Sequence, residues 1–335
     1  RVDRAVVAAV AETCATGTST RKVRRVAERM GVTGMAKDRV SAIAASLGSE
    51  VEELLGRDLS ALDTPYLWLD ATYVKCRRGG RVASTAVVTA IGRDAEGWRH
   101  VLGLGVVDTE PYDSWLGFLR RVRARGVRGV LLVTSDAHEG LRRAAAEVFQ
   151  GAAWQRCVVR LVRDYIREAS SRQLRRRVAR IVVPVFRGKD ADEVRAVYHV
   201  ACEMLSGRCP GAAAVLEAAE PDVLAYLDFT ASHWKRLRTN NVQERANREV
   251  KRRSRVVQVF PSVASLERLV GAVMCDEDDE WSRARYFSEG RMAELYAPEA
   301  PARPAPSPER EAELRLVAER AINASLELAD MLEAA

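Results

Sequence analysis

The spacing of apolar residues changes along the chain from helical to strand-like and back. From Pro65 the spacing has a period of two, and three β-branched runs follow: Tyr66–Lys75, Val82–Ile91 and His100–Val107. Short turn-like segments rich in Gly and Arg separate these runs. The pattern therefore predicts an antiparallel meander of three strands.

Helices and short strands alternate in the next part of the chain. The spacing predicts helices over Tyr112–Arg125 and Gly140–Phe149, and strands over Gly129–Thr134 and Ala153–Val159. The run Gly129–Thr134 is almost wholly apolar, as is typical of a strand that is buried on both faces. The order of three strands, helix, strand, helix indicates a mixed α/β fold.

Helical periodicity dominates the rest of the chain. Near the N-terminus, two predicted helices joined by a glycine turn have the outline of a helix-turn-helix, although any small helical bundle has the same outline. Five of the eleven prolines lie between Pro298 and Pro308 and mark a linker. Helices are expected over 3–15, 21–30, 38–47, 161–180, 190–206, 211–227, 241–255, 265–274 and 309–332.

These patterns divide the chain into five parts. The middle helical block separates two parts of one α/β core, so we interpret it as an all-α insertion. The predicted parts are an N-terminal helical, helix-turn-helix-like DNA-binding region (1–60), the first part of the core (61–160), the insertion (161–235), the second part of the core (236–297), and a Pro-rich linker with a C-terminal helix (298–335).

Composition and charge narrow the function classes. With 335 residues, 47% of them apolar, the chain is not a disordered protein, and no run approaches the ~18 apolar residues of a membrane span. The net charge is 53 − 46 = +7. Windows 160–187 and 235–255 each hold nine basic and two acidic residues, a net of 9 − 2 = +7. Such clustering is typical of a protein that binds a polyanion, and a solvated helix face is the alternative for either window.

The cysteines favour a reducing compartment. Six cysteines form no C-x-x-C pair, and with four histidines they show no zinc-finger spacing. The first residues lack the apolar core of a secretory signal, and the chain starts without Met, so we expect a fragment. Free thiols and the absence of this signal predict a cytoplasmic protein.

Two aspartates stand at the ends of apolar strands. Asp70 follows Tyr66–Leu69, and Asp136 follows the apolar run 130–135. A carboxylate on a buried strand is costly unless it is paired or binds a metal. If the first and fourth strands are neighbours, the two aspartates lie side by side, and a divalent cation would relieve their repulsion. The alternatives are that Asp136 caps the next helix and that Asp70 starts a turn.

A third carboxylate lies on the basic helix. Glu244 and Asn247 are one turn apart and share a face with Lys251. Glu244 is either a metal ligand beside phosphate-binding arginines or a salt-bridge partner of those arginines. Asn240, Asn241 and Asn247 are expected to contact DNA or cap the helix, and the acidic run 276–280 to form a solvated helix end.

Several segments together resemble the Mutator-type bacterial insertion-sequence transposases. They are 18–23, Tyr66–Lys75, Thr134–Leu141, Trp154–Cys157, Thr239–Arg253, 256–261 and 279–290, in order within a resemblance from about residue 3 to 297. The resemblance implies a D-D-E enzyme of the α/β class, with an RNase H-like mixed sheet of three antiparallel strands plus parallel strands. An all-α insertion would separate the second Asp from the Glu, and an N-terminal helical region would precede the sheet.

The resemblance also implies a site and its partners. Asp70, Asp136 and Glu244 would be the catalytic triad and the ligands of two Mg²⁺ ions, for which Mn²⁺ can substitute. Water would free a 3′-OH at the element end, and that 3′-OH would then attack target DNA. The partners would be double-stranded DNA and a second copy or more of the chain, in a nucleoid-associated protein. The expected DNA contacts are Lys75, His138, Arg245, Arg248, Lys251, Arg252 and Arg253.

One position departs from the family pattern. The family has Cys-x-x-His after the second Asp, whereas this chain has Arg160 three residues after Cys157. Arginine cannot act as an acid or base near neutral pH, and Cys157 is expected to pack as a small buried hydrophobe. An inactive or domesticated DNA-binding repressor is therefore an alternative, and a plain RNase H-like nuclease is another.

Overall fold

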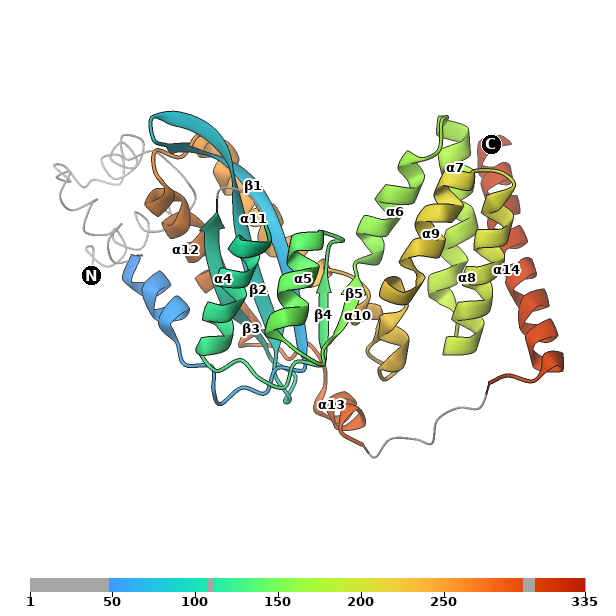
Figure 1. The fold of residues 1–335 in the computed structure, drawn as a ribbon, viewed down its shortest axis with the longest axis horizontal. Helices are drawn as coiled ribbons and strands as arrows, with labels where there is room; N and C mark the ends of the chain where they lie inside the picture. Colours follow the sequence, from blue (N-terminus) through green and yellow to red (C-terminus); the bar gives the residue numbers. More distant parts are fainter. Residues whose placement is uncertain (1–47, 108–110, 298–304, 335) are drawn as a thin grey trace, which may run out of the picture. The chain divides into compact units, whose positions relative to one another are not determined.

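The computed structural model describes residues 48–107, 111–297 and 305–334 (Figure 1). These residues form two compact units. The first comprises the described residues up to Trp154 together with Asn240–Met292, and the second comprises Gln155–Thr239 and the described residues from Ala293 onward. The helices predicted before residue 48 lie outside the described residues, and the five-part domain division stays a prediction.

A five-stranded mixed sheet forms the centre of the first unit, and its last strand, β5, crosses the boundary at Gln155. Its strands are β1 (Tyr66–Arg78), β2 (Arg81–Arg93), β3 (Arg99–Val107), β4 (Leu132–Ser135) and β5 (Ala153–Arg156), in the order β3-β2-β1-β4-β5. β1 pairs with β2 and β2 with β3 in antiparallel fashion, and β1 pairs with β4 in parallel. The predicted meander and the mixed α/β class are confirmed.

Helices α4 (Tyr112–Ala124) and α5 (Glu139–Val148) cover one face of the sheet (Figure 1). Because side chains alternate along a strand, Leu67 and Leu69 of β1 point to this face, where they pack with Trp115 and Phe118 of α4. The side chains between them, Trp68 and Asp70, therefore point to the opposite face.

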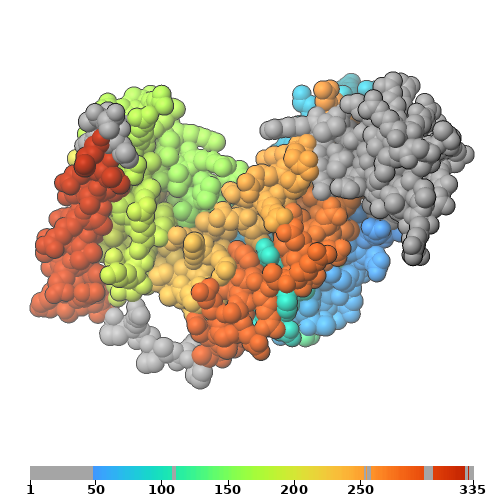
Figure 2. Space-filling model, turned by 180° about the vertical axis from the view of Figure 1, so that it is seen from behind, coloured from blue at the N-terminus to red at the C-terminus, as the bar shows by residue number. Residues whose placement is uncertain are grey.

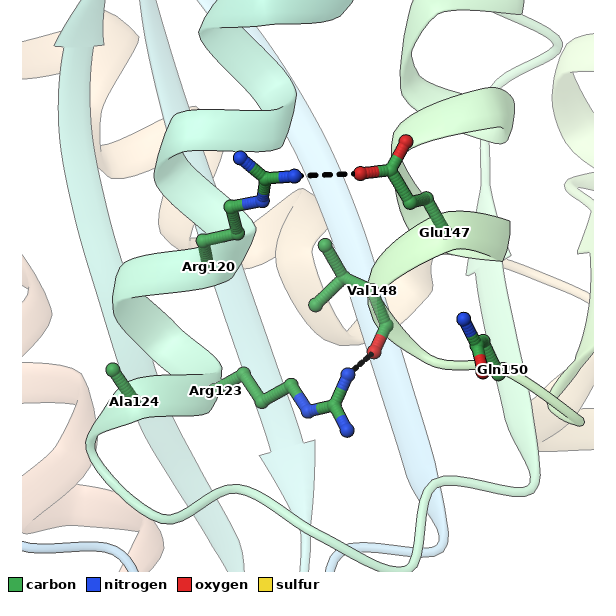
Figure 3. A pocket seen from close by; sticks show the side chains of 6 residues that line it. All are labelled: Arg120, Arg123, Ala124, Glu147, Val148 and Gln150. Carbon is green, nitrogen blue, oxygen red and sulfur yellow. Dashed lines mark hydrogen bonds and ion pairs between the residues drawn. The ribbon is translucent and has the colours of Figure 1, made fainter.

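Polar contacts fix α4 against α5 around a surface hollow of about 520 Å³ (Figure 3). Arg120 forms an ion pair of 2.7 Å with Glu147, and the Arg123 guanidinium donates a hydrogen bond of 2.6 Å to the Val148 carbonyl. Both arginines therefore hold the two helices together.

The opposite face of the sheet carries α11 (Asn241–Val257) and α12 (Val263–Trp281), which pack side by side (Figure 2). α11 contacts β1, and α12 contacts mainly β3. α12 is longer than the predicted helix over 265–274, because the acidic run 276–280 continues it.

The second unit is helical and contains α6 (Val158–Arg167), α7 (Arg172–Val182), α8 (Ala191–Ser206), α9 (Pro210–Val223), α10 (Trp234–Leu237) and α14 (Pro308–Ala334). Short 3₁₀ helices follow α7 (Val183–Arg187) and α9 (Ala225–Asp228), and α13 (Glu289–Leu295) spans the boundary at Met292. The single helix predicted over 161–180 is wrong: Ser171 caps α7, its Oγ accepting the Leu174 N–H at 3.1 Å. The strand predicted over 153–159 is shorter, since α6 begins at Val158.

Candidate active site

Asp70 is buried on β1 and held by α11. Its side chain lies on the sheet face that carries α11, and the residue is only 5% exposed. One carboxylate oxygen, Oδ2, accepts a 2.5 Å hydrogen bond from Asn247 Nδ2, and Oδ1 accepts the Ala71 backbone N–H at 2.9 Å. The alternative that Asp70 starts a turn is excluded, because β1 continues through it to Arg78.

The register of β1 against β4 brings the two aspartates alongside each other. Trp68 pairs in parallel with Thr134, and Asp70 and Asp136 each stand two residues further along their own chains. Residues at matching positions of parallel strands present their side chains to the same face. Extension of this register by two residues places Asp136, which directly follows β4 and is half-buried, on the Asp70 side of the sheet. The neighbour relation on which the prediction depended is confirmed.

Amide side chains attach α11 to β1. Asn240 Nδ2 donates a 2.9 Å hydrogen bond to the Leu69 carbonyl, and Gln243 Nε2 donates to the carbonyls of Trp68 at 2.9 Å and Thr89 at 3.3 Å. Both residues are nearly fully buried. A strand whose two neighbours are β2 and β4 thus receives additional donors from a helix packed on its face. These contacts fix the axial position of α11 relative to Asp70.

Two predicted roles of the asparagines are corrected by these contacts. Asn240 makes no capping hydrogen bond with its side chain, and Asn247 is 8% exposed and bound to Asp70. Neither side chain is available to DNA. Sequence reasoning did not single out Gln243, although a Gln one turn before an Asn on a helix with buried Val and Ala was the available signal.

Glu244 lies at the border between the buried and exposed faces of α11. It is exposed, and it stands one turn before Asn247 and about 60° around the helix from it. Arg245 reaches α12 on the β3 side of α11, as an ion pair of 2.7 Å with Glu280 shows. The order of strands under the helix therefore places Glu244 on the side of α11 toward β4, which is the side of Asp136.

The three carboxylates are of the ligand type that a divalent cation needs, and two of them lie in suitable positions. Carboxylate oxygens are the ligands that Mg²⁺ prefers, and two of them are adjacent by register. In the described part of the chain, however, no three His, Cys, Asp or Glu side chains gather closely enough to hold one ion. The Glu244 side chain therefore does not complete a group of three ligands with Asp70 and Asp136 in this structure.

The basic residues of α11 fall into two groups. Arg245 and Arg252 form ion pairs, Arg245 with Glu280 and Arg252 with Glu249 at 2.7 Å. Arg248 and Lys251 are exposed on the same side as Glu244 and form no ion pair with the described residues. The structure does not describe the Arg253 side chain. On the sheet, Lys75 is exposed near the far end of β1.

His138 caps α5. Its Nδ1 accepts the Leu141 backbone N–H at 3.4 Å, and the residue is exposed. The alternative that His138 has a capping or surface role is therefore confirmed, and the alternative that Asp136 caps this helix is excluded.

The acidic run 276–280 is structural in part. Asp278 accepts the Val101 backbone N–H at 2.7 Å and pairs with Arg57 at 2.8 Å, while Glu277 is 5% exposed. The prediction of a solvated helix end holds for Asp276, Asp279 and Glu280, which are exposed near the end of α12, and is wrong for Glu277 and Asp278. Burial raises the pKa of Glu277, and the nearby Arg245 guanidinium opposes this shift.

We expect Glu277→Gln to gain stability relative to the parent as pH rises. A carboxyl whose folded-state pKa is raised favours folding at low pH, and that contribution is lost as pH rises through the folded value. Urea unfolding at pH 4, 5.5 and 7 would show the variant's free energy of unfolding improving against the parent toward pH 7. A constant difference across this range would contradict the raised pKa.

Comparison with known proteins assigns the chain to a family. A sequence profile described as "Transposase, Mutator family" matches residues 1–284. The chain belongs to this family. It is 39% identical over 287 residues to the transposase for insertion sequence element IS1081 of Mycobacterium tuberculosis, covering 86% of this chain and 69% of that protein.

Two further Mutator-type relatives cover similar shares. The transposase for insertion sequence element IS406 of Burkholderia multivorans is 37% identical over 289 residues, covering 86% of this chain and 74% of the relative. The transposase for insertion sequence element IS256 in transposon Tn4001 of Staphylococcus aureus is 33% identical over 286 residues, covering 84% and 72%. The predicted resemblance to Mutator-type transposases is confirmed.

The position that departs from the Mutator pattern lies in the helical unit. Cys157 is 2% exposed, which confirms its predicted packing as a buried hydrophobe. Arg160 is half-buried in the first turn of α6.

Among the described residues, no helix is long and apolar enough to span a membrane.

Proposed function

We propose that this chain is a DNA transposase that binds the ends of an insertion element, hydrolyses the DNA to free a 3′-OH, and joins that 3′-OH to target DNA. The observation that carries the proposal is the parallel pairing of β1 with β4, because its register, extended by two residues, would bring Asp136 beside Asp70 on the face covered by α11. Membership of the Mutator transposase family supports it.

Asp70, Asp136 and Glu244 would hold the divalent cations, two Mg²⁺ ions or Mn²⁺ in their place. Bound there, such ions supply Lewis-acid activation of the attacking oxygen and neutralise charge on the leaving 3′ oxygen. Glu244 would join the two aspartates by a change of side-chain rotamer, which its exposure permits. The sheet order β3-β2-β1-β4-β5, with the helical unit between β5 and α11 in the chain, supports an RNase H-like core with an all-α insertion.

The residues around Asp70 keep its carboxylate oriented. The Asn247 amide and the Ala71 N–H both donate hydrogen bonds to it. Burial on a strand also removes the freedom of this side chain, so little reorganisation is needed when phosphate arrives.

Double-stranded DNA would lie along the exposed side of α11. Arg248 and Lys251 flank Glu244 there and would contact phosphates, which fixes the position of the DNA without reading its sequence. Arg245 and Arg252 are engaged in ion pairs with α12 and with Glu249, so we assign them to helix packing. Because two element ends must be paired, at least two copies of the chain would act together, in the cytoplasm and associated with the nucleoid.

The test is a strand-transfer assay with the purified chain. End-labelled DNA carrying the terminus of the chain's own element is incubated with a target plasmid in Mg²⁺, in Mn²⁺ or in EDTA. The proposal expects a nicked 3′ end and a labelled plasmid in either metal and neither product in EDTA. Nicked DNA that never joins the plasmid would indicate a nuclease. Specific binding with no nick in either metal would indicate a repressor, and both results overturn the proposal.

A further inference from the structure

The β1–β2 hairpin extends beyond the rest of the sheet (Figure 1). The two strands pair without interruption from Tyr66–Arg93 to Arg78–Arg81. β3 pairs with β2 only from Ala86 onward, and β4 pairs with β1 only as far as Trp68. Residues 72–85 thus form a two-stranded ribbon, which we call the distal ribbon.

One face of the distal ribbon is closed and anchored. Thr72, Val74 and Cys76 are buried on the face that carries α11. The chain after α11 adds two backbone hydrogen bonds at the ribbon edge, Phe260 N–H to the Lys75 carbonyl at 2.9 Å and Arg77 N–H to the Phe260 carbonyl at 2.8 Å. The ribbon therefore projects from a fixed base.

The other face of the distal ribbon is open and cationic. Tyr73, Lys75 and Arg77 alternate along β1 on this face, all exposed, and Tyr73 retains 53% of its accessible surface. Val82, which pairs with Arg77 across the ribbon, is 51% exposed. No acidic residue occurs between 71 and 93. Lys75 and Arg77 on this face, and Arg81 at the tip of the ribbon, form no ion pair with any residue that the structure describes.

Two arginines meet at the ribbon tip, where Arg78 stands directly opposite Arg81. Between them the turn uses Gly79 and Gly80 at φ 50° and 82°, which gives a tight two-residue connection. The pairing concentrates positive charge at the end of the ribbon.

We propose that the distal ribbon inserts into the major groove of duplex DNA beside the site of strand cleavage. This inference rests on the proposed function. The major groove admits a two-stranded β-ribbon, and the open face offers cations for phosphates with Tyr73 and Val82 for the apolar edges of bases. From Asp70 to Arg78 there are eight residues along an extended strand, about 26 Å. The contact would thus fall within about eight base pairs of the reacting phosphate.

The test compares two triple variants of the full chain. In the ribbon variant Lys75, Arg77 and Arg81 become Gln, and in the control variant Arg310, Arg315 and Arg320 of α14 become Gln. Binding to a 40-base-pair duplex is measured by fluorescence anisotropy between 50 and 200 mM salt. Each lost phosphate contact lowers the slope of log affinity against log salt by about 0.9, so the ribbon variant should lose about 2.7. The ratio of the parent's affinity to the ribbon variant's affinity should therefore fall about 40-fold between 50 and 200 mM salt.

A second part of the experiment tests which groove of the DNA the ribbon contacts. Methyl green occupies the major groove and netropsin the minor groove. The difference between parent and ribbon variant should vanish on duplex saturated with methyl green and persist on duplex saturated with netropsin. Thermal unfolding of both variants controls for folding.

The outcomes separate this inference from the proposed function. An unchanged salt slope in the ribbon variant, with normal binding by the parent, overturns the ribbon proposal alone. Failure of the parent to bind any duplex overturns the proposed function. A ribbon variant that changes sedimentation rather than salt slope would show that the ribbon contacts a second copy of the chain, which also overturns the proposal.

Discussion

Asp136→Ala is expected to abolish both cleavage and strand transfer while DNA affinity stays within about twofold of the parent. Removing one of two adjacent carboxylates leaves a divalent cation without a ligand on β4, and such ions contribute several kcal/mol of transition-state stabilisation. A loss of 4 kcal/mol lowers the rate by about a thousandfold. The measurement is the single-turnover rate of nicking on labelled element-end DNA in Mg²⁺.

Two companion variants sharpen this prediction. Asp136→Asn keeps the shape of the side chain and should fail equally, because the charge is what binds the cation. Asp113→Ala removes an exposed carboxylate from the first turn of α4 in the same unit and should retain nearly full activity. If Asp136→Ala nicks DNA within tenfold of the parent, the assignment of Asp136 to the site is refuted.

The sequence predicted the sheet well because strand signals are local. The bounds of the three meander strands agree with the structure to within three residues, since β-branched runs and glycine turns specify them. Adjacency of β1 and β4 was only a condition of the sequence argument, and the structure supplies it. Two strand-end carboxylates suggest a shared partner, because side by side they repel each other, but they do not specify which strands pair.

The errors arose where a distant residue determines the local structure. Glu277 and Asp278 belong to an acidic run that resembles a solvated helix end, yet β3 and Arg57 bind Asp278 and the helix continues. Likewise, the buried Val and Ala of α11 mark the face on which Asn247 lies but do not show which group it binds. Its role depends on Asp70, 177 residues away in sequence.

Asn247→Ala should lower nicking activity about 10- to 100-fold, the usual effect of removing a hydrogen-bond partner of a metal-binding side chain. Asn247 is a positioning residue, because its amide orients the Asp70 carboxylate from a distance of 2.5 Å. The variant should also lose about 1.5–3 kcal/mol of stability, the typical contribution of a hydrogen bond to a charged group. The stability loss is measured by urea unfolding without metal, so it tests the contact independently of catalysis.

Asn247→Asp makes the electrostatic part of this role measurable. It sets a second carboxylate against Asp70, and two carboxylates in contact cannot both ionise, so the pKa of one of them rises. A raised carboxyl pKa contributes stability at low pH that is lost as pH rises through the folded value. Without metal, the variant should therefore fall further below the parent in free energy of unfolding as pH increases from 4 to 8.

The matched control is Asn241→Asp, the same chemical change at the exposed first residue of α11. A negative charge there interacts favourably with the helix N-terminus, so this variant should equal or slightly exceed the parent in stability at pH 7. If the two aspartate variants show the same pH dependence, the carboxylate of Asp70 does not contact position 247. In that case α11 is held against β1 by Asn240 and Gln243 alone, and Glu244 loses the anchor one turn away that places it beside the two aspartates.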